Sequence, residues 1–130
     1  MAGTRPLSLC AHLQRHGEEA GHRGTEELLT RNAPLSALVG FNDLVALGAL
    51  SALEDQGFSV PKRVSVAGFG DSVSAFSRPK ITTVAYPKAE MVRSALDRLL
   101  DRIEGSDDAP EVRRFSVDLL IRQSTRTAAV

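Results

Sequence analysis

Two short polar clusters in the sequence carry side chains that could bind a ligand. Asn42 and Asp43 directly follow a continuous apolar run, and Gly70, Asp71 and Ser72 follow a second one. An amide donates and accepts hydrogen bonds, a carboxylate accepts them and a hydroxyl does both, so each cluster suits a polar ligand. Each cluster comes where an apolar run ends. Whether the two clusters lie close together therefore depends on how the strands formed by these runs are arranged.

The apolar pattern predicts strands and helices in alternation. Strands are expected at residues 37–41, 64–69, 81–84 and 112–121, and helices at residues 18–31, 44–56 and 87–103. This alternation indicates βαβ units, and therefore an α/β fold with a parallel sheet flanked by helices. In such sheets ligands bind beyond the carboxyl ends of the strands. We therefore expect the two polar clusters to converge on one edge of the sheet.

The first cluster has two residues that could serve different purposes. Asp43 stands where the N-cap of the helix at 44–56 is expected, and Gly57 stands at its C′ position. The apolar positions of this helix run almost all the way round it, so the helix should be largely buried. Asn42 then caps nothing, and we interpret it as the better ligand candidate.

Composition and charge exclude several classes of protein. Lys and Arg together number 16, as do Asp and Glu, so the surface lacks the basic excess of a nucleic-acid binder. The scattered arginines of the C-terminal stretch, among them Arg122, are interpreted as a solvated face. Cys10 is the only cysteine, which excludes an intrachain disulfide. With no signal peptide and no membrane span expected, the sequence predicts a cytoplasmic protein.

The histidines suggest a metal site that the spacing does not support. Cys10, His12, His16 and His22 lie near the N-terminus, with His12 and His16 four residues apart. This spacing is not one of the familiar zinc patterns, and ordinary surface histidines are the preferred interpretation. We expect no metal site and no cofactor.

Several segments resemble the LacI (lactose-repressor-like) family of bacterial transcription regulators. The segment LSALVGFNDLVALGALSALEDQGFSVPKRVSVAGFGD is similar to that family's strand, Asn-Asp, helix and Gly-Phe/Tyr-Asp strand end. The segment RPKITTVAYPKAEMVRSALDRLLDRIEG resembles its Pro-x-Leu-Thr-Thr-Val strand and following helix, and LLIRQST resembles its closing motif. The likeness covers residues 21–127, in the family's order and spacing.

The resemblance implies a division of the chain. Residues 21–83 would form most of the second, C-terminal lobe of a type I periplasmic-binding-protein-like domain, which is incomplete here. Residues 84–110 would hold the helix that packs on the first lobe, and residues 111–122 the returning strand. Residues 1–20 have no match, and residues 123–130 form a tail. By the same resemblance, DNA is bound only through a helix-turn-helix headpiece that this sequence lacks.

The resemblance also implies binding residues for a small-molecule effector, a sugar or a sugar acid. Asn42 matches the family's effector-contacting Asn. Many members carry an Asp where this chain has Gly70, so that Asp71 could take its place, with Ser72 beside it. Tyr86 matches a pocket-edge position, although a packing aromatic residue is an equally good interpretation.

A homodimer is expected from the resemblance, and one helix poses a problem of burial. Its stripe of Val92, Leu96, Leu99 and Ile103 would lack the first lobe that covers it in the family. An apolar stripe of this size must be covered. We expect this helix to dock on another copy, to refold onto the local sheet, or to be poorly ordered.

Two alternatives remain beside the regulator. The letters FGDSVS also resemble the Gly-Asp-Ser block of GDSL-type esterases, in which Ser72 would be the nucleophile. That family places its catalytic His downstream, whereas the histidines here are all upstream, so the chain is not expected to be an enzyme. The other alternative is a stand-alone binding or dimerisation module with the same fold.

Overall fold

A computed structural model of the chain describes residues 17–31 and 34–127. In chain order its elements are α1 (Glu18–Thr30), β1 (Ala37–Val39), α2 (Asp43–Asp55), β2 (Ser65–Phe69), β3 (Thr82–Ala85), α3 (Lys88–Ile103) and β4 (Asp118–Leu120). The helices begin and end within one residue of the positions that the sequence predicts. The last strand is much shorter than predicted, since only three of the residues from 112 to 121 belong to it.

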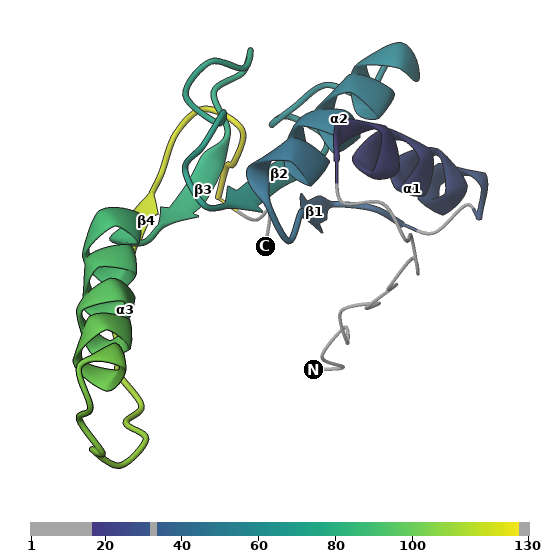
Figure 1. The fold of residues 1–130 in the computed structure, drawn as a ribbon. Coiled ribbons are helices and arrows are strands. Elements are labelled where there is room, and N and C mark those ends of the chain that lie inside the picture. The colour runs from purple at the N-terminus through teal and green to yellow at the C-terminus, as the bar shows by residue number, and fades with distance from the viewer. Residues whose placement is uncertain (1–16, 32–33, 128–130) are drawn as a thin grey trace, which may run out of the picture.

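The strands form a sheet in the order β1-β2-β3-β4 (Figure 1). β1, β2 and β3 are parallel, which confirms the α/β class, whereas β4 is antiparallel to β3. The predicted parallel sheet is thus present in β1, β2 and β3, and the antiparallel β4 makes the sheet as a whole mixed. The physical reason is the path of the chain, which leaves β3 through α3, turns back, and returns beside β3 in the opposite direction.

Helices α1 and α2 pack against each other through glycine. A Cβ placed on Gly21 would lie 2.0 Å from the Val45 carbonyl oxygen, and one on Gly48 would lie 1.8 Å from the Glu18 carbonyl oxygen. Only glycine allows two backbones to approach this closely. Although Gly21 and Gly24 lower the helix propensity of α1, both are buried in the structure, and Gly21 is required by the packing.

The same two helices share a surface ionic contact. His22 on α1 places Nε2 2.9 Å from an Asp55 carboxylate oxygen on α2, and Nδ1 3.5 Å from Glu26 on its own helix. These two carboxylates raise the pKa of His22 above its ordinary value, with the hydrogen bond to Asp55 as the largest cause.

The core lies between α2 and the sheet. Its buried members are Ala46, Leu50, Leu53, Val64, Val66 and Ile81. As predicted, α2 is largely buried, because apolar or small residues occupy nearly all of its positions. Gly57 follows this helix with φ of +73°, the left-handed conformation expected of a C′ glycine. α2 thus forms a packed half of the molecule with α1 and β2.

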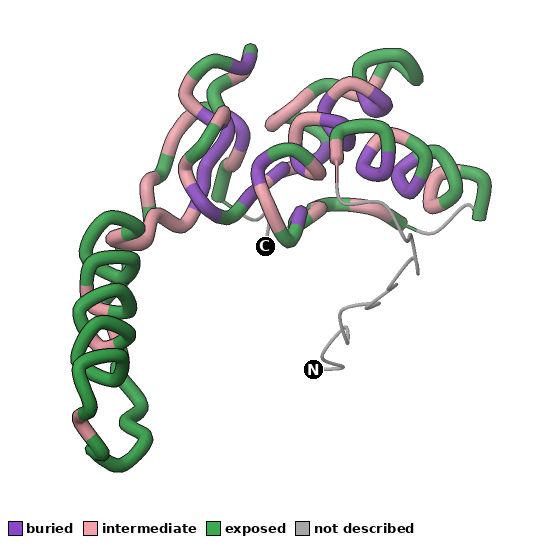
Figure 2. Tube along the Cα trace, in the orientation of Figure 1, coloured by how far each residue is buried: buried purple, intermediate pink, exposed green. Residues whose placement is uncertain are grey.

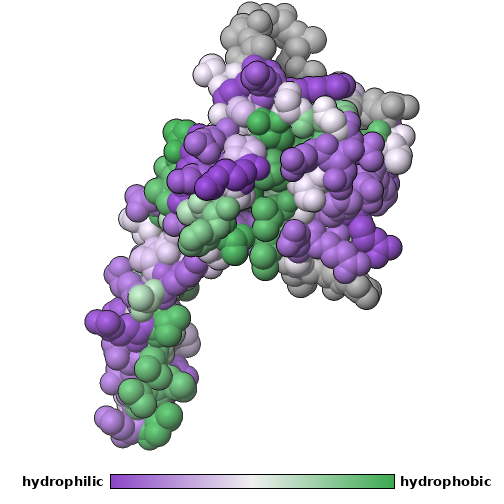
Figure 3. Space-filling model, turned by 90° about the horizontal axis from the view of Figure 1, so that it is seen from above, coloured by the Kyte–Doolittle hydropathy of each residue, from purple (hydrophilic) through white to green (hydrophobic). Residues whose placement is uncertain are grey.

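Helix α3 extends away from this packed half as an arm, and none of its residues is buried (Figures 1 and 2). Its apolar side chains gather along one side of the arm (Figure 3), and they include Val92 (67% exposed), Leu96 (51%), Leu99 (55%) and Ile103 (72%). The expected alternative in which α3 refolds onto the local sheet is therefore wrong. The returning chain is tied to the arm by polar contacts, such as the hydrogen bond that Arg113 donates to Ser94.

Candidate functional site

The carboxyl ends of β1, β2 and β3 lie at one edge of the sheet, because these strands are parallel neighbours. The residues that follow them include Asn42 after β1, Asp71 and Ser72 after β2, and Tyr86 after β3. We name these four residues the strand-end site. Several contacts join the strand ends; among them, the backbone N–H of Ser72 donates to the Asp43 carboxylate, and Tyr86 stacks on Phe69 with 5.5 Å between ring centroids. The sequence-predicted residues thus share one edge.

Asn42, and not Asp43, is the N-cap of α2. Asn42 has extended backbone angles, and its side-chain oxygen accepts a hydrogen bond of 2.8 Å from the backbone N–H of Val45. The expectation that Asp43 caps the helix is therefore wrong by one residue. This assignment commits the amide oxygen of Asn42 to the helix, because an N-cap oxygen satisfies an otherwise unpaired N–H of the first turn.

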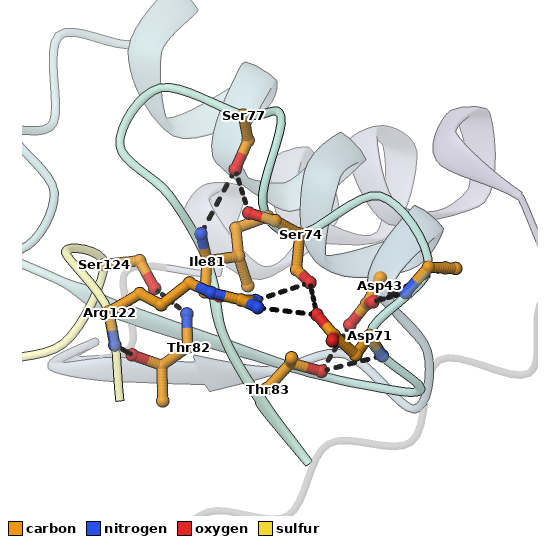
Figure 4. A network of polar contacts seen from close by, with 10 residues as sticks. Asp43, Asp71, Ser74, Ser77, Ile81, Thr82, Thr83, Arg122 and Ser124 are labelled. Atoms are coloured by element: carbon orange, nitrogen blue, oxygen red, sulfur yellow. Dashed lines mark hydrogen bonds and ion pairs between the residues drawn. The ribbon is translucent and has the colours of Figure 1, made fainter. Parts of the chain in front are cut away.

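Asp43 instead joins three elements from the first turn of α2. Its carboxylate is fully buried, and it accepts hydrogen bonds of 2.6 Å from the Thr83 hydroxyl on β3 and 2.6 Å from the Ser72 backbone N–H (Figure 4). Gly68 on β2 leaves room for this side chain, since a Cβ there would lie 2.5 Å from Asp43 Oδ1. Buried carboxylates need such donors, so Asp43 fixes the loop after β2.

Asp71 adopts a left-handed backbone conformation, with φ of +48°. Its carboxylate oxygen Oδ1 accepts hydrogen bonds from Arg122 Nη2 at 2.7 Å and from the Ser74 hydroxyl at 2.9 Å (Figure 4). The Arg122 guanidinium, followed by the Ser74 hydroxyl, holds the pKa of Asp71 below its usual range. The carboxylate therefore stays ionised across the physiological pH range.

Arg122, just after β4, is the site-linked residue that sequence reasoning missed. Its side chain is 18% exposed, which contradicts the interpretation of this arginine as part of a solvated face. Besides Asp71, its guanidinium donates to the Ser74 hydroxyl at 2.8 Å and to the Ile81 carbonyl oxygen at 3.1 Å. The closing motif LLIRQST carries this residue, but its partner Asp71 lies 51 residues earlier in the chain.

The same closing motif also ties the end of the chain to the sheet. Ser124 is fully buried; its hydroxyl donates to the carbonyl oxygen of Val66 and accepts from the backbone N–H of Thr82. The motif therefore secures the end of the chain to β2 and β3.

Tyr86 lies half-buried where β3 leads into α3. Its ring stacks on Phe69, and Lys88 places its ammonium 5.3 Å from the ring centroid. Gly70, with φ of +117°, passes beside the ring without a side chain of its own. Tyr86 also lines an open hollow, the rest of whose wall is formed by Ala85, Pro87, Glu90, Arg114, Phe115, Ser116 and Asp118. The ring therefore packs against Phe69 and also lines the hollow, so the structure is compatible both with a pocket-edge residue and with a packing aromatic residue.

The geometry around Ser72 differs from that of an esterase nucleophile. The Ser72 hydroxyl lies 3.4 Å from the Asp43 carboxylate, and within the described part of the chain His22 bonds Asp55 on the α1–α2 surface. His12 and His16 lie outside the described residues, as does Cys10. Among residues 17–31 and 34–127, no group of three His, Cys, Asp or Glu could hold a metal ion. None of the helices described is both long and apolar enough to cross a membrane.

A mixed sheet with α2 packed on it and α1 packed on α2 defines an α/β lobe whose strand ends meet at one edge. Residues 5–125 match the periplasmic binding protein-like domain family, and the chain belongs to it. Its curated relatives are LacI-family transcription regulators, which are not enzymes. They include the HTH-type transcriptional regulator AscG of Escherichia coli K12, 40% identical over 106 residues that are 81% of this chain and 31% of AscG.

Solved structures agree with this assignment. A LacI-type transcription regulator from Bifidobacterium animalis subsp. lactis matches with a TM-score of 0.81 and 32% identity, over 86% of this chain and 40% of that one. A LacI family regulator from Enterococcus faecium with bound ribose matches with a TM-score of 0.76 and 30% identity, over 85% and 41%. The chain spans about a third of the length of the curated relatives it matches.

Proposed function

We propose that this chain is the second-lobe part of the effector-binding domain of a cytoplasmic LacI-type transcription regulator. Its strand-end site would bind a small-molecule effector, a sugar or a sugar acid, through Asn42, Asp71, Ser72 and Tyr86. The proposal rests on one observation: the ends of β1, β2 and β3 lie at one edge of the sheet, and Asp43 links them to one another. DNA contact would belong to a helix-turn-helix headpiece outside residues 1–130.

The chemistry of the site supports a polyhydroxyl ligand. Asn42 supplies an amide, Asp71 an ionised carboxylate, the exposed residue Ser72 a hydroxyl and Tyr86 an aromatic face, which together match alternating hydroxyl groups and an apolar ring surface. Similar solved structures carry sugars: the regulator from Enterococcus faecium has bound ribose, and the regulator CelR is in complex with cellobiose. These two sugars are therefore the first probes to try, together with D-gluconate as a sugar acid.

The proposal includes a homodimer. Monomeric proteins rarely expose contiguous apolar patches as large as the stripe on α3. The first lobe would cover this stripe in a complete LacI-type domain, and in the 130-residue chain by itself a second copy would cover it. Leu44 is 41% exposed on α2, and by the resemblance to LacI-type regulators it would lie near the dimer interface. Leu47, which lies nearby on the same helix, packs against the core instead.

The test of sugar binding must separate the ligand role of Asn42 from its capping role. Asn42→Asp keeps an oxygen to cap α2 but removes the amide N–H donors. We expect this variant to unfold at nearly the same denaturant concentration as the wild type, and to bind the sugar at least about tenfold more weakly, since a lost hydrogen bond to a ligand costs on the order of 1–2 kcal/mol.

Calorimetric titration with ribose, cellobiose and D-gluconate measures this affinity. Thr30→Ala serves as the control, because among the described residues the Thr30 hydroxyl bonds the Glu27 carbonyl oxygen of its own helix, and Thr30 belongs to none of the strand ends. If Asn42→Asp binds the sugar as tightly as the wild type does, Asn42 is a cap alone and the proposed site is wrong. If the wild type binds none of the three sugars, the proposed function of this chain fails.

A further inference from the structure

Only one of the two oxygens of the Asp71 carboxylate accepts hydrogen bonds from the described residues. Both hydrogen bonds that the described residues make to it end on Oδ1, at 2.7 Å from Arg122 Nη2 and 2.9 Å from the Ser74 hydroxyl (Figure 4). The side chain is 31% exposed, whereas that of Arg122 is 18% exposed. Asp71 thus combines one oxygen held from within the protein with a side chain that still reaches solvent at the strand-end site.

Arg122 is itself held at several points. Nη1 donates to the Ser74 hydroxyl at 2.8 Å and to the Ile81 carbonyl oxygen at 3.1 Å, while the backbone N–H of Arg122 donates to the Thr82 hydroxyl at 2.9 Å. A planar guanidinium with these partners has little freedom to rotate. The direction of the Asp71 carboxylate is therefore imposed by β3 and by the end of β4, through Arg122.

We propose that Arg122 is the positioning residue of the strand-end site, and that it fixes Asp71 so that Oδ2 accepts a hydrogen bond from a hydroxyl group of the effector. This inference rests on the proposed function for its ligand, and it adds the role of Arg122 and the atom that makes the contact. It also adds a selection rule. An ionised carboxylate only accepts, so the effector must offer a hydroxyl at this point, and the acidic group of a sugar acid must lie elsewhere.

The backbone of the loop around Asp71 needs side-chain contacts, such as the one with Arg122, to hold it in place. Asp71 holds a left-handed backbone conformation that is uncommon for residues other than glycine, and the conformation persists only when contacts hold it in place. The backbone N–H of Asp71 meets the Thr83 hydroxyl at a long 3.5 Å, which leaves the side-chain contacts as the stronger restraint. Two further charged groups lie near this loop: Asp43 on α2 accepts a hydrogen bond from the backbone N–H of Ser72, the residue after Asp71, and Lys88 on α3 also lowers the pKa of Asp71.

The test compares Arg122→Met with Arg122→Lys in the 130-residue chain, and uses Arg113→Met as the matched control. Arg113 is 60% exposed and bonds Ser94 on the arm, so its loss should leave the site unchanged. The first readout is an NMR titration of the Asp71 carboxyl carbon together with the backbone amide resonances of residues 70–74. It needs no ligand and therefore does not depend on the proposed function.

In Arg122→Met we expect the pKa of Asp71 to rise toward its ordinary value and the amide resonances of the loop to move, while those of α3 stay in place. In Arg122→Lys we expect the pKa of Asp71 to stay nearly as low as in the wild type, because the ammonium still supplies a positive charge. The amide resonances of the loop should nevertheless differ from those of the wild type, because an ammonium lacks the planar fork of a guanidinium. This variant also keeps the test decisive if Arg122→Met fails to fold. Unchanged loop resonances in both variants would overturn the positioning role.

The second readout is the pH profile of sugar affinity. In the wild type the affinity should be flat between about pH 5 and pH 7, since Asp71 remains ionised. In Arg122→Met the dissociation constant should be about tenfold higher at pH 7 and should increase further as pH falls toward 4, when Asp71 takes up a proton. A flat profile in Arg122→Met would contradict a contact through Asp71. If no probe binds the wild type, the proposed function fails while the NMR readout still decides the role of Arg122.

Discussion

The packed half of the molecule and the α3 arm are built from helices of similar length, yet they differ completely in burial. α2 buries seven of its residues against α1 and the sheet, whereas α3 buries none, although its apolar residues repeat at helical spacing. An amphipathic stripe thus predicts that a helix has a face to cover, and not that the described chain covers it. Burial is decided by what lies opposite the helix.

The sharpest test of this difference exchanges the same residue type in both regions. Leu53 on α2 is fully buried, whereas Leu96 on α3 is 51% exposed. We expect Leu53→Ala to lower the free energy of unfolding by about 2–5 kcal/mol, because it leaves a cavity in the core. Leu96→Ala should change it by less than about 0.5 kcal/mol, since alanine is a good helix former at an exposed position.

Urea titration followed by circular dichroism measures both values for the leucine variants. If Leu96→Ala proves as costly as Leu53→Ala, the stripe on α3 is covered in solution and contributes to folding. The difference in burial between α2 and α3 would then hold for a single copy of the chain, and not for the assembly that forms in solution.

A second prediction addresses the stripe directly. If a second copy covers α3, the wild-type chain should have a solution mass above that of a monomer, and Leu96→Gln/Leu99→Gln should reduce it to the monomer mass. Analytical ultracentrifugation at several concentrations measures this change, and Leu53→Ala is not a suitable control because it also alters the core. A wild-type chain that is a monodisperse monomer would count against the dimer.

The smallest expected effect concerns the surface contact of the packed half. The neighbouring Asp55 and Glu26 carboxylates raise the pKa of His22 in the folded chain. A raised pKa means that protonated His22 stabilises the fold below the ordinary histidine pKa of about 6.5, and that this contribution is lost as pH rises through the folded value.

The free energy of unfolding of the wild type should therefore fall slightly as pH rises above about 6.5, by more than in His22→Gln. Urea midpoints measured in steps of half a pH unit test this, with His22→Gln as the variant that lacks the titrating group. Equal slopes in the two proteins would show that the contact between α1 and α2 does not depend on the charge of His22.

Much of the fold follows from the sequence because the elements of the packed half have strong local signals. The alternation of apolar runs and helices, with Gly57 as a helix stop, defines α2, β2 and β3 to within one residue of their bounds. The direction of β4 could not be predicted in this way, since a strand carries no local sign of whether its neighbour runs parallel or antiparallel. That direction depends on how α3 leaves the sheet.

The site shows the same limit at finer scale. Asn42 and Asp43 are both good N-cap residues, and the choice between them depends on which residue first adopts helical angles, which the sequence does not state. The prediction took Asp43 as the N-cap, whereas Asn42 caps the helix and Asp43 is buried. Arg122 was missed because its partner Asp71 is brought to it only by the pairing of β3 with β4.

The glycine contact between α1 and α2 has a consequence for motion. Where Gly21 and Gly48 meet the facing helix, no flexible side chain lies between the backbones, so the spacing of the two helices cannot adjust by a change of rotamer. We therefore expect the two helices to shift together. Asn42 stands at the amino end of α2, so we expect a displacement of the strand end that it follows to move α1 as well.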